Sequence, residues 1–112
     1  MSDIQQITKA LIKFRNERDW SQFHDTKNLA IAIAIEAAEL NELFLWKSVD
    51  EAEQVDKDKI KEELADIFAF TFLLAEKHCF DIKEIVLEKI ARNAEKYPVN
   101  KSRGNATKYS EL

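Results

Sequence analysis

The stretch from residue 29 to residue 40 reads Leu29-Ala-Ile-Ala-Ile-Ala-Ile-Glu-Ala-Ala-Glu-Leu40, an apolar run that two glutamates interrupt. A second stretch, Ile60-Lys-Glu-Glu-Leu-Ala-Asp-Ile-Phe68, carries a glutamate and an aspartate at the same spacing. Acids three residues apart lie on one face of a helix. Buried carboxylates are costly unless a positive charge compensates them, so the pattern predicts a bound divalent cation. The four acids are Glu36, Glu39, Glu63 and Asp66.

The position of each acid on its helix can be estimated at about 100° per residue. Glu36 then lies in the middle of an apolar stripe and Glu39 at its edge. On the second stretch Glu63, rather than Glu62, points inward, and Asp66 lies at the edge. Two alternatives are solvent-facing acids and buried salt bridges. Aliphatic neighbours argue against the first, and the scarcity of cations on these faces argues against the second.

The ligand set indicates which metal would bind. All four side chains offer oxygen, which suits Mg²⁺, Mn²⁺ or Ca²⁺ better than zinc or copper. Mg²⁺ in particular shares itself with substrate phosphates, so we expect Mg²⁺, with Mn²⁺ as a substitute, to seat a polyphosphate. The chain has one glycine and no Ser-His-Asp or Cys-His set, which excludes a Gly-rich phosphate loop and disfavours covalent catalysis. The simpler mechanism has water as the nucleophile and one of the glutamates as proton acceptor.

Length and composition limit the class of protein. The 112 residues make one domain, 1–112, with a helical body at 1–98 and a polar, basic tail at 99–112. One Gly and one Pro favour an all-α fold. A net charge of −4 argues against nucleic acid as a partner, and the longest apolar run is too short to span a membrane. A single cysteine, Cys79, expected to be buried, is typical of the reducing cytoplasm.

Four principal helices are expected from the periodicity and the capping residues. A capping box, Ser2 with Gln5, begins the first helix, and Pro98 ends the last. The polar stretch 48–58 has room for a short helical turn. The expected helices run from Asp3 to Arg18, from Thr26 as N-cap to Trp46 or Lys47, from Lys59 to His78, and from Asp81 as N-cap to Lys96.

The third helix is apolar nearly all round between Leu64 and Ala75. A helix of this kind must be surrounded by other helices. The remainder of so short a chain can hardly cover it, so a partner subunit is expected to do so.

Aromatic and basic residues supply further candidates for ligand binding. Trp20 and Trp46 could stack on a nucleobase, worth roughly 1–3 kcal/mol per base, although core packing is the alternative. His24, in the polar segment beside Trp20, could hydrogen-bond a base or sugar. Lys89, Asn93 and Lys96 share one face of the fourth helix and could meet phosphates, although simple solvation also explains them.

The two acidic motifs, Glu36-Ala-Ala-Glu39 and Glu63-Leu-Ala-Asp66, match the E-x-x-E … E-x-x-D signature of the MazG-like nucleoside triphosphate pyrophosphohydrolases. Over nearly its whole length the chain resembles the dCTP pyrophosphatase branch of this family. The stretches that carry this likeness are Arg18-Asp-Trp-Ser-Gln-Phe-His24, Glu39-Leu-Asn-Glu-Leu-Phe-Leu-Trp46, Lys96-Tyr-Pro-Val99 and Lys108-Tyr-Ser-Glu-Leu112.

The resemblance implies a four-helix-bundle-type fold that assembles as a homo-oligomer, with a tetramer built from two dimers favoured over a dimer. It implies Mg²⁺-dependent cleavage of a nucleoside triphosphate, giving a monophosphate and pyrophosphate. It assigns the metal and the catalysis to Glu36, Glu39, Glu63 and Asp66. Substrate contacts are assigned to Trp20, Ser21, Gln22, Phe23, His24, Trp46, Phe70, Lys89, Asn93 and Lys96.

Some positions depart from the pattern of the family. Leu11 replaces a histidine, and Phe70 a tyrosine, that close relatives can carry at the substrate. Ile35 replaces the first acid of a doublet in full-length MazG proteins. These differences leave the base open: dCTP or a modified cytosine nucleotide is expected, with dUTP or non-standard purine nucleotides as the alternative. A non-catalytic helical oligomer that binds metal or nucleotide is the rival interpretation.

Overall fold

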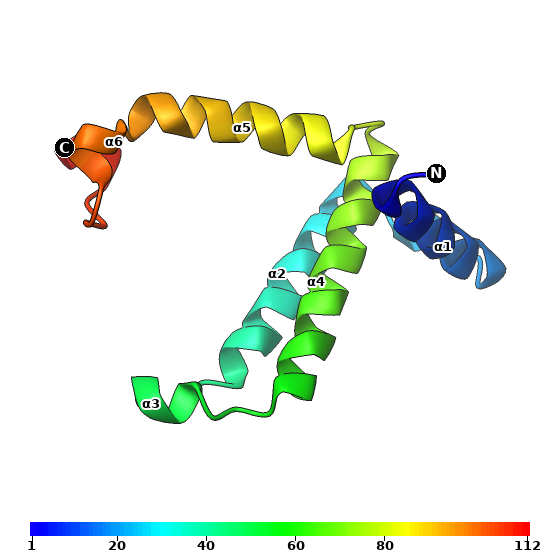
Figure 1. The fold of residues 1–112 in the computed structure, drawn as a ribbon. Coiled ribbons are helices and arrows are strands. Elements are labelled where there is room, and N and C mark those ends of the chain that lie inside the picture. The colour runs from blue at the N-terminus through cyan, green and yellow to red at the C-terminus, as the bar shows by residue number, and fades with distance from the viewer. The chain divides into compact units, whose positions relative to one another are not determined.

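The computed structural model describes residues 1–112 as helices joined by turns and short connections (Figure 1). The chain divides into two units, Met1–Cys79 and Phe80–Leu112, each with contacts of its own. No strand is present, so the predicted all-α class is confirmed. None of the helices combines the length and the apolar composition that a membrane span requires.

The first unit is built on an antiparallel pair of helices, α2 and α4, which lie side by side (Figure 1). Helix α1 packs against α4, and the short α3 lies in the connection between α2 and α4. A 3₁₀ turn, η1, separates α1 from α2. The bounds are α1 Asp3–Glu17, η1 Ser21–Phe23, α2 Thr26–Glu42, α3 Val49–Ala52 and α4 Lys57–Lys77.

Reciprocal side-chain caps begin two of these helices. Gln5 N donates to Ser2 Oγ over 3.2 Å, and Ser2 N donates to Gln5 Oε1 over 2.9 Å, which confirms the predicted capping box of α1. The same arrangement between Ser48 and Glu51 begins α3. This second box explains why the polar stretch contains a helical turn.

Helix α2 differs from the prediction at both ends. Its N-cap is Asp25, not Thr26, because the Asp25 carboxylate accepts the Asn28 N–H over 2.7 Å. Its last helical residue is Glu42, so Trp46 and Lys47 lie beyond the helix. The backbone there closes into turns, and Trp46 takes a left-handed conformation with φ 64°.

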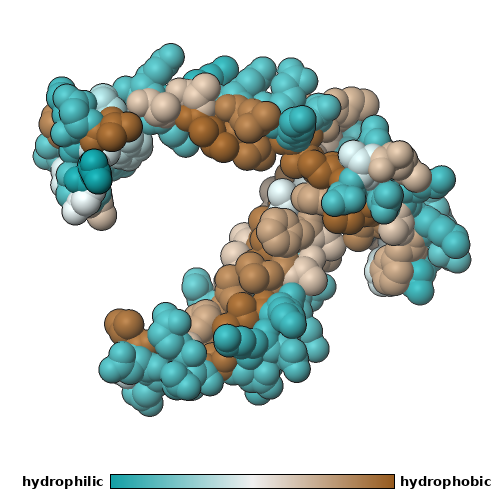
Figure 2. Space-filling view, in the orientation of Figure 1, coloured by the Kyte–Doolittle hydropathy of each residue, from teal (hydrophilic) through white to brown (hydrophobic).

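The core of the first unit is small and lies where the N-terminal part of α2 meets the C-terminal part of α4. Leu29 is 1% exposed, and Leu73 and Ala75 are also buried. Many other apolar side chains on the two helices remain open to solvent, and apolar surface is visible along them (Figure 2). The exposed apolar residues on these helices include Ile31, Ile35, Leu64 and Phe68.

The second unit contains α5, Ile82–Lys96, followed by α6, Val99–Ser102, and the 3₁₀ turn η2, Tyr109–Glu111. Asp81 caps α5 as predicted, because its carboxylate accepts the Glu84 N–H over 2.9 Å. The ring of Tyr97, the C-cap residue of α5, meets the Tyr109 ring of the polar tail edge to face with centroids 5.9 Å apart. One side of α5 is apolar and exposed (Figure 2). Its residues are Ile85, Val86, Leu87 and Ile90.

Two other expectations have different outcomes. Cys79 is exposed, not buried, and its φ of 57° places it in a left-handed turn directly after the C-cap of α4. The closed four-helix bundle stays a prediction, because α5 belongs to the second unit.

Candidate active site

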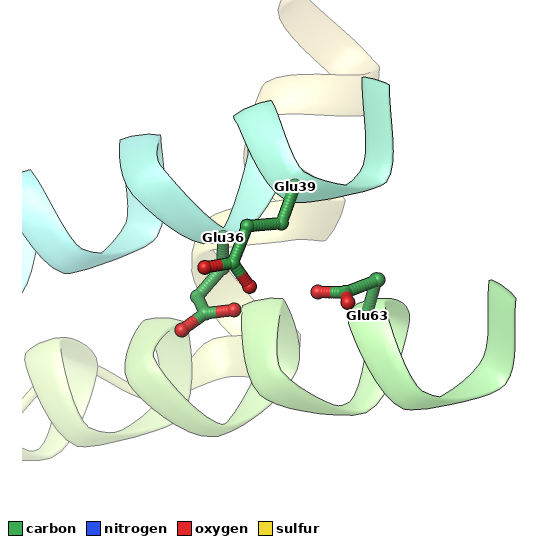
Figure 3. A group of neighbouring side chains, drawn as sticks. All are labelled: Glu36, Glu39 and Glu63. Carbon is green, nitrogen blue, oxygen red and sulfur yellow. The ribbon is translucent and has the colours of Figure 1, made fainter. Parts of the chain in front are cut away.

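Three carboxylates converge between α2 and α4. Glu36 and Glu39 project from α2 toward Glu63 on α4 (Figure 3). One oxygen from each of the three side chains lies within 4.8 Å of the other two. Because α2 and α4 are antiparallel neighbours, the i, i+3 spacing on α2 places both of its acids against the facing helix.

Glu36 and Glu63 are half-buried, and each has one carboxylate oxygen that is buried without a hydrogen-bond partner. Burial, aided by the Glu39 carboxylate, raises the pKa of Glu36 to about 7. Burial and the charge of Glu39 also raise the pKa of Glu63. The uncompensated cluster therefore favours holding a proton near neutral pH.

Asp66 lies one helical turn after Glu63 on α4 and is exposed. It is not one of the three acids that converge within 4.8 Å. Its negative charge nevertheless contributes to the raised pKa of both Glu36 and Glu63. Asp66 is therefore electrostatically part of this region while its side chain remains open to solvent.

The cluster fits a hard divalent cation. All the converging donors are carboxylate oxygens, and two oxygens lack any partner. The salt bridge of the first unit joins Arg15 to Glu76 over 3.4 Å. No lysine or arginine forms an ion pair with the carboxylates of the cluster. A bound Mg²⁺ would supply the missing positive charge.

A row of rings runs from α1 through the connecting segment to Phe70, which lies about two turns after Glu63 on α4. The Trp20 ring meets Phe14 edge to face at 5.7 Å between centroids and lies 6.5 Å from the His24 ring. The His24 ring in turn meets Phe70 of α4 edge to face at 6.3 Å. These ring contacts join α1, the connecting segment and α4. Three of the four residues, Trp20, His24 and Phe70, were predicted to contact the substrate.

His24 has a polar atom that is not satisfied within the chain. Its Nδ1 is buried and has no hydrogen-bond partner. Burial, with a smaller contribution from the Arg15 charge, lowers the pKa of His24 below its ordinary value. The lowered pKa favours the neutral imidazole, which offers one donor and one acceptor to a ligand.

The remaining predicted site residues are distributed differently. Ser21, Gln22 and Phe23 form η1, and Gln22 Nε2 donates to the Asp19 carbonyl over 2.9 Å. Trp46 is 93% exposed and takes part in no ring contact within the chain. Lys89, Asn93 and Lys96 lie on α5 in the second unit, where Lys96 Nζ lies 4.9 Å from the centre of the Tyr109 ring.

The structure adds residues that the sequence did not mark for the site. Phe14 of α1 was not among the predicted site residues, yet its ring contacts Trp20. The Arg18 guanidinium lies 3.7 Å from the centre of the Phe14 ring and 6.0 Å from that of Trp20. The sequence did contain a signal for Arg18, because this residue begins the Arg18–His24 stretch that resembles the family.

Comparison with known proteins places this geometry in a family. Residues 31–112 match the MazG-like family. Over 114 aligned positions the chain is 37% identical to dCTP pyrophosphatase 1 of Rattus norvegicus and 34% identical to that of Homo sapiens. Both alignments cover 97% of this chain and 67% of the relative.

A solved structure shares the fold. A crystal structure of a pyrophosphatase from Archaeoglobus fulgidus superposes with a TM-score of 0.83 at 35% sequence identity. The match covers 88% of this chain and 94% of that one. Together these relatives confirm the predicted enzyme class, a nucleoside triphosphate pyrophosphatase. The chain therefore belongs to the MazG-like family, in its dCTP pyrophosphatase branch.

Proposed function

We propose that this enzyme is a Mg²⁺-dependent pyrophosphohydrolase that cleaves dCTP, or a modified cytosine nucleotide, between the α and β phosphates. The products are a nucleoside monophosphate and pyrophosphate, so the enzyme would remove one nucleotide from the cellular pool. The observation that carries the proposal is the convergence of Glu36, Glu39 and Glu63, with two buried oxygens that lack partners. The names of the relatives support cytosine as the base.

Each part of the chain has a role in this reaction. Glu36, Glu39 and Glu63, with Asp66 beside them, would hold Mg²⁺. When bound, the metal neutralises phosphate charge and helps to orient the attacking water. One carboxylate of the cluster then accepts the proton that the water loses as it attacks the α phosphorus. The anhydride bond breaks, and pyrophosphate leaves.

The aromatic row would bind the nucleoside. Trp20 offers a face for stacking, and neutral His24 offers a hydrogen bond to the base or sugar. Lys89, Asn93 and Lys96 on α5 are proposed to meet the phosphates, because the acidic cluster has no cation of its own. Trp46 is exposed in the single chain. We propose that its side chain contacts the substrate, or is buried by a partner subunit, only in the assembled protein.

Assembly is part of the proposal. The three buried residues of the chain are a small core for 112 residues, and the exposed apolar surfaces on α2, α4 and α5 support a homo-oligomer. A tetramer composed of two dimers is favoured. A single exposed thiol at Cys79 is compatible with the cytoplasm as the working compartment.

The test is a panel of nucleoside triphosphates incubated with purified protein and Mg²⁺, with release of pyrophosphate as the readout. We expect the highest kcat/KM for dCTP or a 5-substituted dCTP. In EDTA we expect no release of pyrophosphate. A higher kcat/KM for dUTP or for a non-standard purine nucleotide would reassign the base. Release of orthophosphate instead of pyrophosphate would contradict the bond that we propose is cleaved.

A further inference from the structure

The segment between α1 and α2, residues 18–25, carries two of the proposed nucleoside contacts, Trp20 and His24, yet little regular structure supports it. Only η1 lies within it. Asp19 takes a left-handed conformation with φ 53°, so the chain reverses sharply after α1. The position of both rings therefore depends on their ring contacts and on a small number of hydrogen bonds.

Backbone bonds join the start of this segment to α1 and close the turns within it. Trp20 N donates to the Arg15 carbonyl over 3.0 Å, and Phe23 N donates to the Trp20 carbonyl over 2.9 Å. His24 N closes the next turn on the Ser21 carbonyl over 3.2 Å. None of these bonds joins the segment to α2, which carries the acidic cluster.

The side chain of Asn28 makes that connection. Its Nδ2 donates to the Phe23 carbonyl over 3.1 Å and to Asp25 Oδ2 over 3.2 Å. The Asn28 backbone N–H separately donates to Asp25 Oδ1 and caps the helix. The Asn28 amide thus reaches backward from the first turn of α2 and holds the Phe23 carbonyl, which directly precedes His24. The cap of α2 needs only the backbone N–H of Asn28.

The place of Asn28 on α2 gives this bond its significance. Glu36 lies about two turns further along the same helix, a rise of about 12 Å. An extended nucleotide with its base at the aromatic row and its phosphates at the acids needs these two sites at a fixed separation. A nucleotide can bind both sites at once only while this separation is kept, so displacement of one site weakens substrate binding.

We infer that Asn28 is a positioning residue for substrate: its side-chain amide fixes the Trp20–His24 segment to α2, at a set distance from the carboxylate cluster. This inference rests on the proposed function for its kinetic consequence. The structural consequence, namely that residues 20–24 are held in one conformation, does not depend on the proposed function.

The test compares Asn28→Ala with Asn41→Ala, an exposed asparagine on the same helix whose side chain makes no hydrogen bond. Asn28→Ala keeps the backbone cap and loses both amide bonds. We expect KM to rise about tenfold, the effect of about one to two net hydrogen bonds, with kcat within about twofold of wild type. Asn41→Ala should leave both constants unchanged. An unchanged KM in Asn28→Ala would overturn the inference.

A second variant separates positioning from capping. The exchange Asp25→Asn with Asn28→Asp re-forms the pair between these side chains and keeps an N-cap, but leaves the Phe23 carbonyl without a donor. We expect its melting temperature to stay near that of wild type while KM stays raised. Restoration of KM together with the melting temperature would show that Asn28 acts only through the cap.

A third readout needs no turnover. Amide hydrogen exchange at Phe23 and His24 should accelerate at least about tenfold in Asn28→Ala, and not in Asn41→Ala, while the interior of α2 is unchanged. Equal exchange in both variants would refute the role of Asn28 even if the enzyme is active. Conversely, accelerated exchange in a protein that releases no pyrophosphate would leave Asn28 in its structural role and would contradict the proposed function alone.

Discussion

A carboxylate oxygen of Glu36 on α2 lies within 4.8 Å of one of Glu63 on α4, and each residue has an oxygen that is buried without a partner. Two half-buried acids at this distance repel each other when both are ionised. The folded protein therefore favours either a proton or a bound cation at this point.

The first prediction concerns the pH dependence of stability without metal. The pKa of Glu36 rises from 4.5 to about 7 on folding, so between these values the folded state binds more protons than the unfolded state. Stability then falls as pH rises through this window. In EDTA, we expect the melting temperature to decrease from pH 5 to pH 7.5. Scanning calorimetry measures it directly.

Glu36→Gln is the control for this effect, because glutamine does not titrate and removes one negative charge from the cluster. We expect a flatter pH profile and a higher melting temperature at pH 7.5 than wild type, both in EDTA. A wild-type melting temperature that does not change between pH 5 and pH 7.5 would mean that the carboxylates are solvated and have ordinary pKa values.

A second prediction concerns ligands. We propose that Mg²⁺ binds the folded cluster and not the unfolded chain. It should then raise the melting temperature at pH 7.5, and a non-hydrolysable dCTP analogue should raise it further. At 100 times Kd each ligand adds about 2.7 kcal/mol to the free energy of unfolding. Differential scanning fluorimetry with EDTA, Mg²⁺ and Mg²⁺ plus analogue gives the three values. A rise with Mg²⁺ alone, followed by none with the analogue, favours a metal-stabilised scaffold.

A third prediction concerns Trp20. Base stacking is worth roughly 1–3 kcal/mol, so Trp20→Ala should raise KM by about tenfold or more with a smaller change in kcat. Steady-state kinetics measure both constants, and circular dichroism checks that helicity is kept. Because Trp20 also contacts Phe14, Trp20→Phe serves as the control and should retain most of the affinity. Equal KM values for the alanine variant and wild type would remove Trp20 from the base site.

A fourth prediction concerns assembly. Phe68 is 58% exposed on α4 and contacts Phe72 edge to face. We expect Phe68→Asp to dissociate the oligomer, because an ionised side chain would be buried against a partner. Lys9→Asp, on exposed α1 surface, should leave the assembly intact. Light scattering at micromolar concentration reports the mass. A wild-type protein that is monomeric there contradicts this prediction.

Much of the secondary structure could be predicted because it depends on local chemistry. The Ser2–Gln5 box and the Asp81 cap are short-range hydrogen bonds, and the sequence pattern marks both. The end of α2 could not be predicted in the same way. Leu43 to Trp46 continue the apolar pattern, yet the backbone closes into turns there and Trp46 adopts a left-handed conformation that is unusual for a bulky residue.

The acidic part of the site was also accessible from sequence. Helical periodicity placed Glu36 and Glu63 inside an apolar stripe, and the structure shows them half-buried and facing each other across α2 and α4. Trp20, His24 and Phe70 were named from the family resemblance, but the contacts that join them into a row and the bonds that support the row were not accessible. The contact between Phe14 and Trp20 depends on the reversal at Asp19, and the Asn28 bond depends on the folded connection, neither of which has a periodic signal.

The central claim is that the carboxylate cluster holds Mg²⁺ for pyrophosphate release, and it is tested most directly by comparing Glu63→Gln with Glu62→Gln. Both variants remove one charge from neighbouring positions of α4, but only Glu63 lies among the converging oxygens. With dCTP and Mg²⁺, we expect Glu63→Gln to lose more than about 100-fold in kcat/KM, beyond the 10- to 100-fold typical of outer partners of a metal. Glu62→Gln should stay within about threefold of wild type on the same scale, as surface changes usually do. Equal pyrophosphate release by the two variants would contradict the claim.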